Sequence, residues 1–253
     1  MEFVKPPRSL VSAAGKAIGD FAMIREGDRV LLGLSGGKDS LSLLHVLKEL
    51  QAKAPVRFEL AAATVDPESP DFDPSPLKAY MAELGVPYFY ERQDIVGQAQ
   101  TSMEGDSFCA FCSRMRRGIL YSAARREGYN VLALAQHLDD AAETFLMSAF
   151  FGGKLRTMQA HYVIDAGDLR VIRPLIYARE RQTAAFAKSA GLPVIFENCP
   201  ACFSKPMQRF HMKQLLAQQE KENAKLFPSL RTAMRPLMGS PGEKRQREST
   251  GEG

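Results

Sequence analysis

The sequence predicts an α/β fold, an open parallel sheet with helices on both faces. Short apolar stretches rich in Leu, Val, Ile and Ala recur along the chain, and segments with helical periodicity lie between them. Strands that are apolar throughout are typical of parallel sheets covered on both faces. The regular alternation of strand and helix favours the same arrangement.

The elements of the first half follow from this alternation. Apolar residues at helical spacing precede the first buried strand, and Gly85 ends the helix before the third strand. The expected segments are a helix over 10–24, a strand over 28–34, a helix over 39–50, a strand over 57–66, a helix over 76–84 and a strand over 86–91.

The second half continues the pattern and adds a hairpin. A pair of cysteines opens a long basic helix, and Gly152 and Gly153 end a later helix. The segments HYVID and LRVIRPL surround an AGD turn, which indicates either a hairpin or two extended segments around the turn. The expected segments are a helix over 107–129, a strand over 130–136, a helix over 137–151, a hairpin over 161–175, a helix over 178–191, a strand over 193–196 and a helix over 207–226.

Composition and charge narrow the class of protein only broadly. The 253 residues are 45% hydrophobic and carry a net charge of +4, which is compatible with nucleic-acid binding but not specific for it. No apolar stretch reaches the roughly 18 residues of a spanning helix, and the N-terminus lacks the apolar block of a signal peptide. These features predict a soluble, cytoplasmic protein with no membrane partner.

A glycine-containing turn joins the first buried strand to a helix. Residues 31–42 read LLGLSGGKDSLS. Glycines allow a tight turn, and the following helix offers unpaired N–H groups to a phosphate. The nucleotide motifs G-x-x-x-x-G-K-[ST] and G-x-G-x-x-G are both absent. A phosphate-binding loop of another type is therefore predicted, formed by Ser35, Gly36, Gly37, Lys38, Asp39 and Ser40.

Carboxylates follow two more of the predicted strands. Asp66 ends the second strand, where it is either a nucleotide contact or a turn residue before Pro67. The segment AQHLDDAAET places Asp139 and Asp140 at the start of a helix. Carboxylates there bind Mg²⁺ together with nucleotide phosphates, or interact with the helix dipole. Asp39 and Asp139 are the candidate Mg²⁺ ligands.

All four cysteines occur in C-x₂-C pairs. They are Cys109 with Cys112 and Cys199 with Cys202. In a cytosolic chain such pairs indicate metal binding or redox chemistry more than structural disulfides. Thiolate pairs hold zinc or iron–sulfur clusters, and the spacing alone does not choose between these two. Because the pairs are far apart in the sequence, the fold must bring them together.

Several motifs resemble known families. S-G-G-x-D-S after a strand resembles the PP-loop ATP pyrophosphatases, and AQHLDDAAET resembles their G-H-H-x-D-D segment, with Ala135 and Gln136 in place of its Gly and first His. The series SGGKDS, CAFCSRMRRGILY, FGGKLRTM, RPLIYARERQ and CPACFSKPMQR is similar to the tRNA 2-thiocytidine synthetases, over about residues 8–235. The resemblance implies the adenine nucleotide α hydrolase-like fold of the PP-loop enzymes.

The resemblance also implies cofactors. ATP is expected at the loop, with Mg²⁺, and a [4Fe–4S] cluster is expected to be held by Cys109, Cys112 and Cys202, with Cys199 as a neighbour or an alternative ligand. One iron of such a cluster has no protein ligand. That open position can accept sulfur, as the open position of a catalytic metal site accepts a substrate.

The implied reaction is the conversion of a cytidine in tRNA, at position 32 of the anticodon loop, to 2-thiocytidine. ATP adenylates the base before sulfur replaces its oxygen, and Lys38, Asp39 and Asp139 are the expected catalytic residues. A cysteine desulfurase is the expected sulfur donor, and a homodimer is one option for the assembly. The candidate contacts to tRNA phosphates are Arg116, Arg117, Lys154 and Arg156.

Two other functions each fit part of the sequence. A lysidine-type tRNA-cytidine ligase would also adenylate cytidine, but it has no need for the cysteine pairs. A zinc-stabilised, non-catalytic RNA-binding module would explain the cysteines and the basic runs, but it leaves SGGKDS without a purpose.

Four segments are expected along the chain. The PP-loop domain spans 29–200 and follows an N-terminal helical segment over 1–28. A helical extension follows over 201–238. The remaining tail over 239–253 is polar and rich in Pro and Gly, and is therefore predicted to be disordered.

Overall fold

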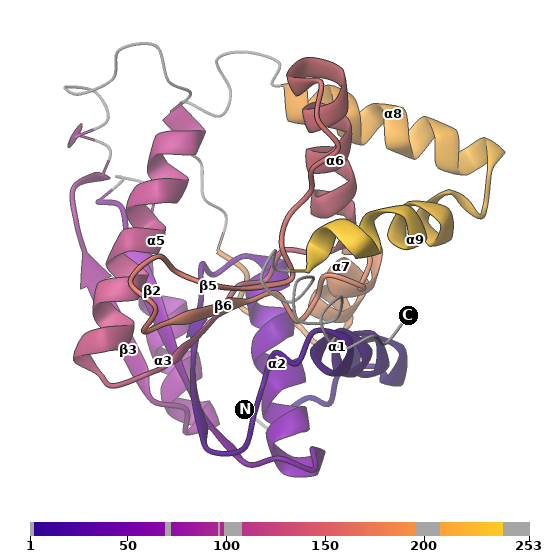
Figure 1. The fold of residues 1–253 in the computed structure, drawn as a ribbon. Helices are drawn as coiled ribbons and strands as arrows, with labels where there is room; N and C mark the ends of the chain where they lie inside the picture. Colours follow the sequence, from indigo (N-terminus) through magenta and orange to yellow (C-terminus); the bar gives the residue numbers. More distant parts are fainter. Residues whose placement is uncertain (1–2, 69–71, 96, 99–107, 196–207, 240–253) are drawn as a thin grey trace.

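A six-stranded sheet lies at the centre of the structure, a computed structural model that describes residues 3–68, 72–95, 97–98, 108–195 and 208–239 (Figure 1). The strand order is β3-β2-β1-β4-β6-β5, so β1 lies between β2 and β4. The strands are β1 (Asp28–Gly33), β2 (Phe58–Asp66), β3 (Tyr88–Arg92), β4 (Val131–Ala133), β5 (His161–Val163) and β6 (Arg170–Ile172).

Neighbouring strands run parallel except at one edge. The pairs from β3 through β6 are parallel, and β5 pairs with β6 in an antiparallel hairpin. Both the parallel sheet and the hairpin are as the sequence predicts. The strand predicted over 193–196 is wrong for its described part, because residues 193–195 form no strand there. Instead, the Ile195 N–H donates to the carbonyl of Gly36 at 2.9 Å, and Ile195 thereby lies against the loop after β1.

Side chains of the central strands alternate between two hydrophobic clusters. On β1, Val30 and Leu32 belong to one cluster, and Leu31 between them belongs to the other. On β2, Ala62 and Ala63 divide in the same way. Successive residues of a strand point to opposite faces, so both faces of the sheet are buried, as expected for parallel strands.

Helices cover both faces of the sheet (Figure 1). One face is covered by α1, α2, α3 and α7, whose apolar residues join the first cluster, and the other is covered by α5. Within the described ranges, every helix is too short or too polar to span a lipid bilayer. The bounds are α1 (Arg8–Asp20), α2 (Lys38–Lys53), α3 (Ser75–Leu84), α5 (Phe108–Arg126) and α7 (Glu180–Ser189).

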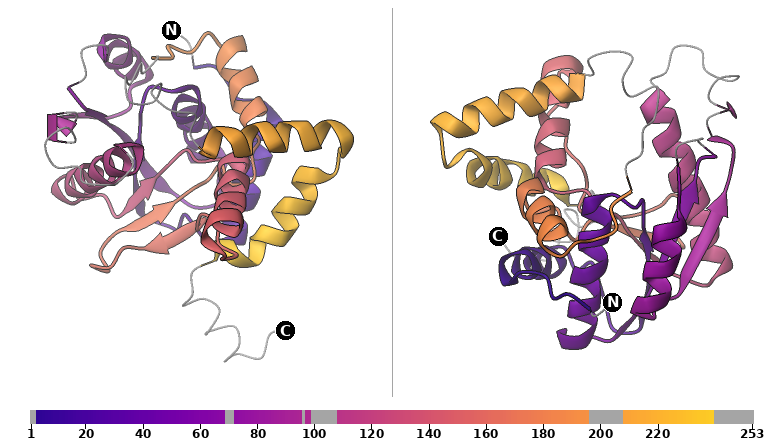
Figure 2. Two further views of the ribbon diagram at one scale, coloured as in Figure 1. Left: turned by 90° about the horizontal axis from the view of Figure 1, so that it is seen from above. Right: turned by 180° about the vertical axis from the view of Figure 1, so that it is seen from behind.

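Three further helices extend the fold beyond the end of β4. The first, α6 (Leu138–Gly152), packs against α8 (Gln208–Glu222) and α9 (Leu226–Met238), as Figure 2 shows from above. At the end of α9, the Ala160 N–H donates to the carbonyl of Met238 at 2.9 Å and joins this group of helices to the hairpin. The α5 and α6 helices stand on two sides of the sheet's carboxyl edge (Figure 1).

Candidate active site

The loop between β1 and α2 has a backbone shape that favours glycine. Gly36 has a φ of +84°, and a Cβ at this position would lie 3.2 Å from atoms of Ile195 and Leu77. Gly37 precedes α2 in an extended conformation, and no side chain of the described residues caps the helix there. The first N–H groups of α2 are therefore left for a ligand, as in other phosphate-binding loops.

Two serine hydroxyls lie within this loop. Ser35 Oγ and Ser40 Oγ are 3.1 Å apart, and the Gly37 N–H donates to Ser35 Oγ at 3.3 Å. Ser40 Oγ donates to the carbonyl of Gly37 at 3.0 Å. These bonds hold both hydroxyls at the N-terminus of α2, where each can also bind a phosphate oxygen.

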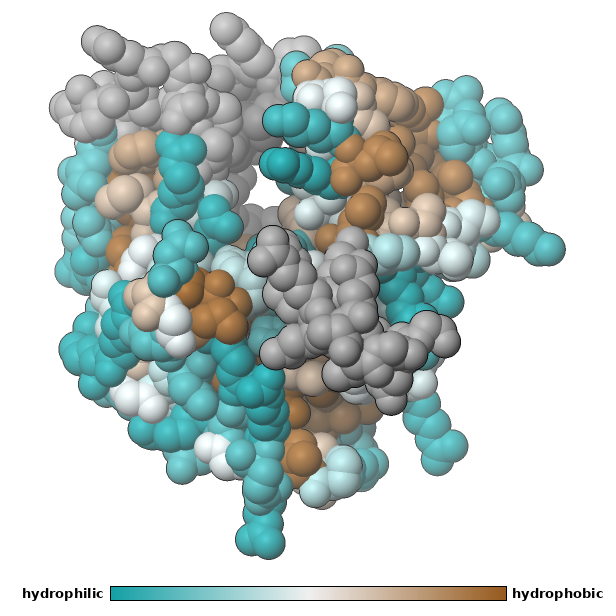
Figure 3. Space-filling view, in the orientation of Figure 1, coloured by the Kyte–Doolittle hydropathy of each residue, from teal (hydrophilic) through white to brown (hydrophobic). Residues whose placement is uncertain are grey.

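A cavity of about 1190 Å³ opens at the carboxyl ends of β1, β2 and β4. Figure 3 shows the molecule hollowed between the part that carries α5 and the part that carries α6 and α8. Gln136, from the loop after β4, lies in the lining. The expected site residues that line this first cavity are Ser35, Gly37, Asp39, Ser40, Arg116 and Arg117.

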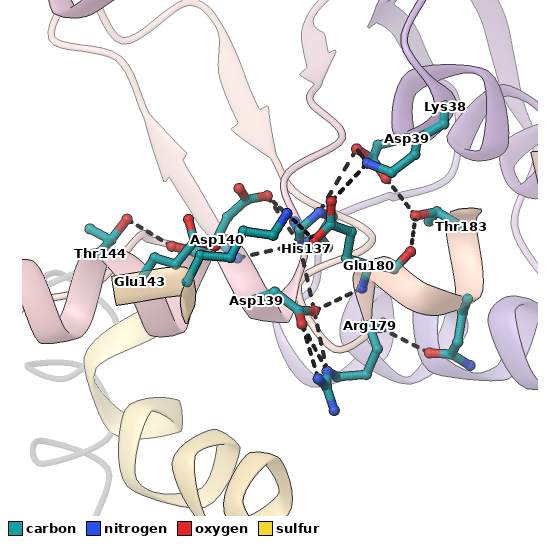
Figure 4. Close-up of polar contacts among 12 residues, drawn as sticks. Lys38, Asp39, His137, Asp139, Asp140, Glu143, Thr144, Arg179, Glu180 and Thr183 are labelled. Atoms are coloured by element: carbon teal, nitrogen blue, oxygen red, sulfur yellow. Dashed lines mark hydrogen bonds and ion pairs between the residues drawn. The ribbon is translucent and has the colours of Figure 1, made fainter. Parts of the chain in front are cut away.

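Lys38 points to the start of α7 and not into the lining of the first cavity. Its ammonium binds Asp39 at 2.8 Å and Glu180 at 3.0 Å (Figure 4). Glu180 also binds Lys213 of α8 at 2.6 Å, and Thr183 donates its hydroxyl to Asp39. One carboxylate thus holds two ammonium groups beside the phosphate-binding loop.

The ion pairs among Lys38, Asp39, Glu180 and Lys213 shift the pKa values of Lys38 and Glu180. Burial by itself lowers the pKa of Lys38, but Asp39 and Glu180 outweigh it and raise the pKa above its ordinary value. Burial by itself raises the pKa of Glu180, but Lys213 and Lys38 outweigh it and lower the pKa to about 2. Both side chains therefore stay charged at neutral pH.

The two aspartates at the start of α6 have different surroundings. Asp140 lines the first cavity, and it forms a capping box with His137 through bonds of 3.0 and 3.3 Å. Asp139 faces α7, where it accepts the Glu180 N–H at 2.7 Å and pairs with Arg179 at 3.0 Å (Figure 4). A catalytic role for Asp139 stays a prediction, and the geometry places Asp140 closer to the ligand space.

Asp66 closes the turn after β2. Its carboxylate accepts the Glu68 N–H at 2.8 Å and the hydroxyl of Tyr90. It lies outside the cavity lining, although the neighbouring Val65 is part of it. The structure therefore shows the turn role, and the nucleotide contact stays a prediction.

The two remaining expected tRNA contacts lie beyond the end of α6. Arg156 lines a second cavity of about 580 Å³, and Arg117 lines both this cavity and the first. Lys154 is exposed, and its carbonyl accepts the hydroxyl of Ser148 at 2.7 Å. Three of the four candidates, Arg116, Arg117 and Arg156, thus lie on two cavities that share a boundary.

Cationic side chains outnumber carboxylates in the first cavity. Asp39 and Asp140 are the described carboxylates of the lining. The arginines of the lining are Arg114, Arg116, Arg117, Arg173 and Arg209. Guanidinium groups bind phosphate oxygens well, so the charge balance favours an anionic ligand.

The described part of the chain holds one complete cysteine, Cys112. It is half-buried near the N-terminal end of α5, next to Ser113 of the cavity lining. Cys109 is three residues earlier in α5, so the two positions share a helix face. The Cys109 side chain and both late cysteines, Cys199 and Cys202, fall outside the described residues.

A cluster can be tested only against these residues. The described side chains form no group of three or more metal ligands, and the side chains of Cys109, Cys199 and Cys202 lie outside them. Gln208 and Arg209, the first described residues after that pair, line the same cavity as Ser113. Thiol chemistry and the convergence of both segments on one cavity fit a [4Fe–4S] cluster.

Several residues of the site carry roles that the sequence did not reveal. Glu180 binds Lys38, Arg179 binds Asp139, and Thr183 binds Asp39. Arg173 lies in the lining of both cavities. All four belong to or closely follow the motif RPLIYARERQ, so the motif was a signal for them even though their roles were not assigned.

Comparison with known families agrees with this geometry. The family model described as a PP-loop domain matches residues 10–201, which is most of the chain. The fold and the glycine loop therefore define a PP-loop protein, a class that binds ATP.

Curated relatives narrow the class further. The tRNA-cytidine(32) 2-sulfurtransferase of Geobacter sulfurreducens is 41% identical over 239 residues, which is 92% of each chain. The enzyme of the same name from Syntrophotalea carbinolica is 42% identical over 234 residues, 92% of this chain and 89% of the relative. The chain belongs to the tRNA-cytidine(32) 2-sulfurtransferase family. It is thus an enzyme of the sulfurtransferase class, which decides against a non-catalytic, zinc-stabilised module.

A solved structure shares the fold. The U34-tRNA thiolase NcsA from Methanococcus maripaludis, solved with its [4Fe–4S] cluster, superimposes with a TM-score of 0.72. The match covers 90% of this chain and 78% of that one at 22% identity. An NH3-dependent NAD synthetase from Campylobacter jejuni is more distant, with a TM-score of 0.50 and 18% identity. These likenesses confirm the predicted fold class.

Acid titration tests how much the ion pairs of Glu180 add to the stability of the fold. Because the pKa of Glu180 is lowered from 4.5 to about 2, its ion pairs add stability that is fully present above pH 4.5. This stability is lost as the pH falls through about 2. We expect Glu180→Gln to lower the free energy of unfolding at neutral pH, and the difference from wild type to shrink across that window.

The matched variant is Lys213→Ala. It removes one of the two ammonium partners, so the window in which Glu180 loses its contribution should move to higher pH. Denaturant unfolding followed by circular dichroism at several pH values measures both effects. A Glu180→Gln difference that does not change with pH would contradict the assignment.

Proposed function

We propose that the chain thiolates tRNA in an ATP-dependent reaction that converts a cytidine to 2-thiocytidine, at position 32 as in the names of its relatives. The observation that carries the proposal is the convergence on one cavity of the glycine loop, the start of α6 and the cysteine-bearing helix α5. The family membership supports the substrate class.

The first step is adenylation of the base. The α2 N-terminus, with Ser35 and Ser40, binds the phosphates of ATP, and Lys38 adds positive charge from the side of α7. The 2-oxo oxygen of cytidine attacks the α-phosphorus, and pyrophosphate leaves. The oxygen, otherwise a poor leaving group, is then bound to AMP.

Magnesium belongs to this first step. Asp39 lines the cavity beside the phosphate-binding loop and is our first ligand. Asp139 was expected as the second, but it lies outside the cavity lining, and its carboxylate binds Arg179 and the Glu180 N–H. Asp140 faces the cavity one residue later and supports the same role from the same helix.

The second step replaces the activated oxygen by sulfur. Cys109, Cys112 and one of the late pair would hold a [4Fe–4S] cluster, which would supply sulfur at the oxidation level of sulfide for C2. AMP then leaves with the former base oxygen. Cys112 packs against the second hydrophobic cluster, one residue before Ser113 of the cavity lining, and the arginines of that lining would keep the anionic substrates in place. A cysteine desulfurase is the proposed source of the sulfur, and a thiol reductant would supply the two electrons that bring its persulfide sulfur to the sulfide level.

Replacement of Lys38 tests the role of the loop. We expect Lys38→Ala to lower tRNA-dependent pyrophosphate release by about 10²–10³-fold, because a charge that stabilises the phosphates in the transition state is removed. The iron and sulfide content of the protein should not change.

Lys213→Ala is the matched control, because Lys213 binds the same carboxylate, Glu180, from α8. A purely structural role for Lys38 would make the two variants equally defective. Equal defects, or normal pyrophosphate release by Lys38→Ala, would remove Lys38 from the chemistry.

Replacement of Cys112 tests the cluster. Cys112→Ser should lower the iron and sulfide content of anaerobically purified protein and abolish 2-thiocytidine in tRNA, because a thiolate ligand is lost. ATP binding should persist, since the phosphate-binding loop does not include this residue. Ser113→Ala, one position along α5 and in the lining of the first cavity, is the control. A full complement of iron in Cys112→Ser would exclude Cys112 as a ligand.

A further inference from the structure

Arg173 is a buried arginine that lines both of the cavities described above. It directly follows β6 and is 6% exposed. A guanidinium group keeps its charge even when it is buried, and an isolated buried charge is unfavourable. A partner for this charge is therefore expected.

Every contact of Arg173 within the described chain is with a neutral group. Its Nε donates to Gln136 Oε1 at 3.0 Å, and its Nη1 donates to the carbonyl of Gln159 at 2.5 Å. The guanidinium carbon lies 5.4 Å from the centre of the Tyr162 ring. These contacts fix the orientation of the group, but among the described residues no carboxylate lies within ion-pair distance to balance its charge.

A second arginine faces the same place from the opposite helix. Arg117 of α5 lines both cavities, and its Nε donates to the carbonyl of Ser113 at 3.2 Å. Burial lowers the pKa of Arg173, and the positive charge of Arg117 lowers it further. The two guanidinium groups therefore repel each other, and an anion between them would relieve both the repulsion and the burial of charge.

The position of the pair separates it from the phosphate-binding loop. Arg117 and Arg173 are the residues shared by the two described linings. The second cavity contains Arg156 and Thr157 but no residue of the loop over 35–40. A polyanion that runs from the second cavity into the first would place a phosphate at this boundary, whereas the phosphates of ATP would lie at the loop, which lines the first cavity and not the second.

We propose that Arg117 and Arg173 together bind one backbone phosphodiester of the RNA substrate at the boundary between the two cavities. The proposal rests on the proposed function, because it takes the RNA as the substrate of the first cavity. Gln136 and Gln159 hold the guanidinium of Arg173 toward the phosphate, and Arg156 extends the path along the second cavity.

The test is equilibrium binding of unmodified tRNA to the full chain, without reaction, over a series of salt concentrations. We expect Arg173→Met to weaken tRNA binding about tenfold, because a charge-assisted contact is lost. The slope of log Kd against log salt concentration should fall by about one, because one fewer phosphate charge is neutralised. Arg117→Gln should act in the same way. The Kd for a non-hydrolysable ATP analogue should not change in either variant.

Two further variants keep the result interpretable. Arg181→Gln removes an arginine that is 73% exposed at the start of α7, and it should leave both tRNA binding and the salt slope unchanged. Gln136→Glu places a carboxylate beside Arg173 Nε with little change of shape. It should therefore weaken tRNA binding and lower the salt slope as the loss of the Arg173 charge would. This variant gives a result even if Arg173→Met does not fold.

The outcomes separate the two sources of phosphate. Unchanged tRNA affinity and salt slope in the Arg117 and Gln136 variants would overturn the proposal. Weakened binding of the ATP analogue with unchanged tRNA binding would assign the pair to ATP and overturn it as well. A wild-type chain that binds no tRNA would refute the proposed function itself, which is a different result.

Discussion

The site depends on the burial of β1 at the middle of the sheet. This strand pairs with β2 on one side and β4 on the other, and its side chains are buried on both faces. The loops after β1 and β4 therefore leave the same edge side by side, in the kind of crevice where open α/β sheets bind ligands. Gly36 turns the chain there under Ile195. Anything that displaced β1 would move the phosphate-binding loop, Gln136 and Asp140 together.

Charge is distributed unevenly around this crevice. On the side of α7 and α8, cations have carboxylate partners, as in the pairs of Lys38 with Glu180 and of Arg209 with Glu143. On the side of α5 and β6, Arg117 and Arg173 have no such partner within the described chain. The balanced side can hold its geometry without a ligand, while the unbalanced side gains stability from an anion. That division suits an enzyme that must bind a nucleotide and a polyanionic RNA in adjoining spaces.

Local patterns account for what could be predicted from the sequence. The glycine loop, the parallel strands and the hairpin each follow from a few neighbouring residues, and the structure confirms them. Contacts between distant residues could not be predicted in this way. Asp139 is 40 positions from Arg179, and nothing near it in the sequence shows that its carboxylate is occupied. The apolar run at 193–195 has the composition of a strand, but its place over Gly36 depends on packing.

The central proposal is that ATP activates the base oxygen and not the sulfur. A tRNA substrate with ¹⁸O at the C2 oxygen of the target cytidine tests it directly. After one round of thiolation, mass spectrometry of the released AMP should show a single ¹⁸O atom in its phosphate, because the C2–O bond breaks after the oxygen has bonded to phosphorus. Unlabelled AMP, or ADP and phosphate as the products, would contradict the account.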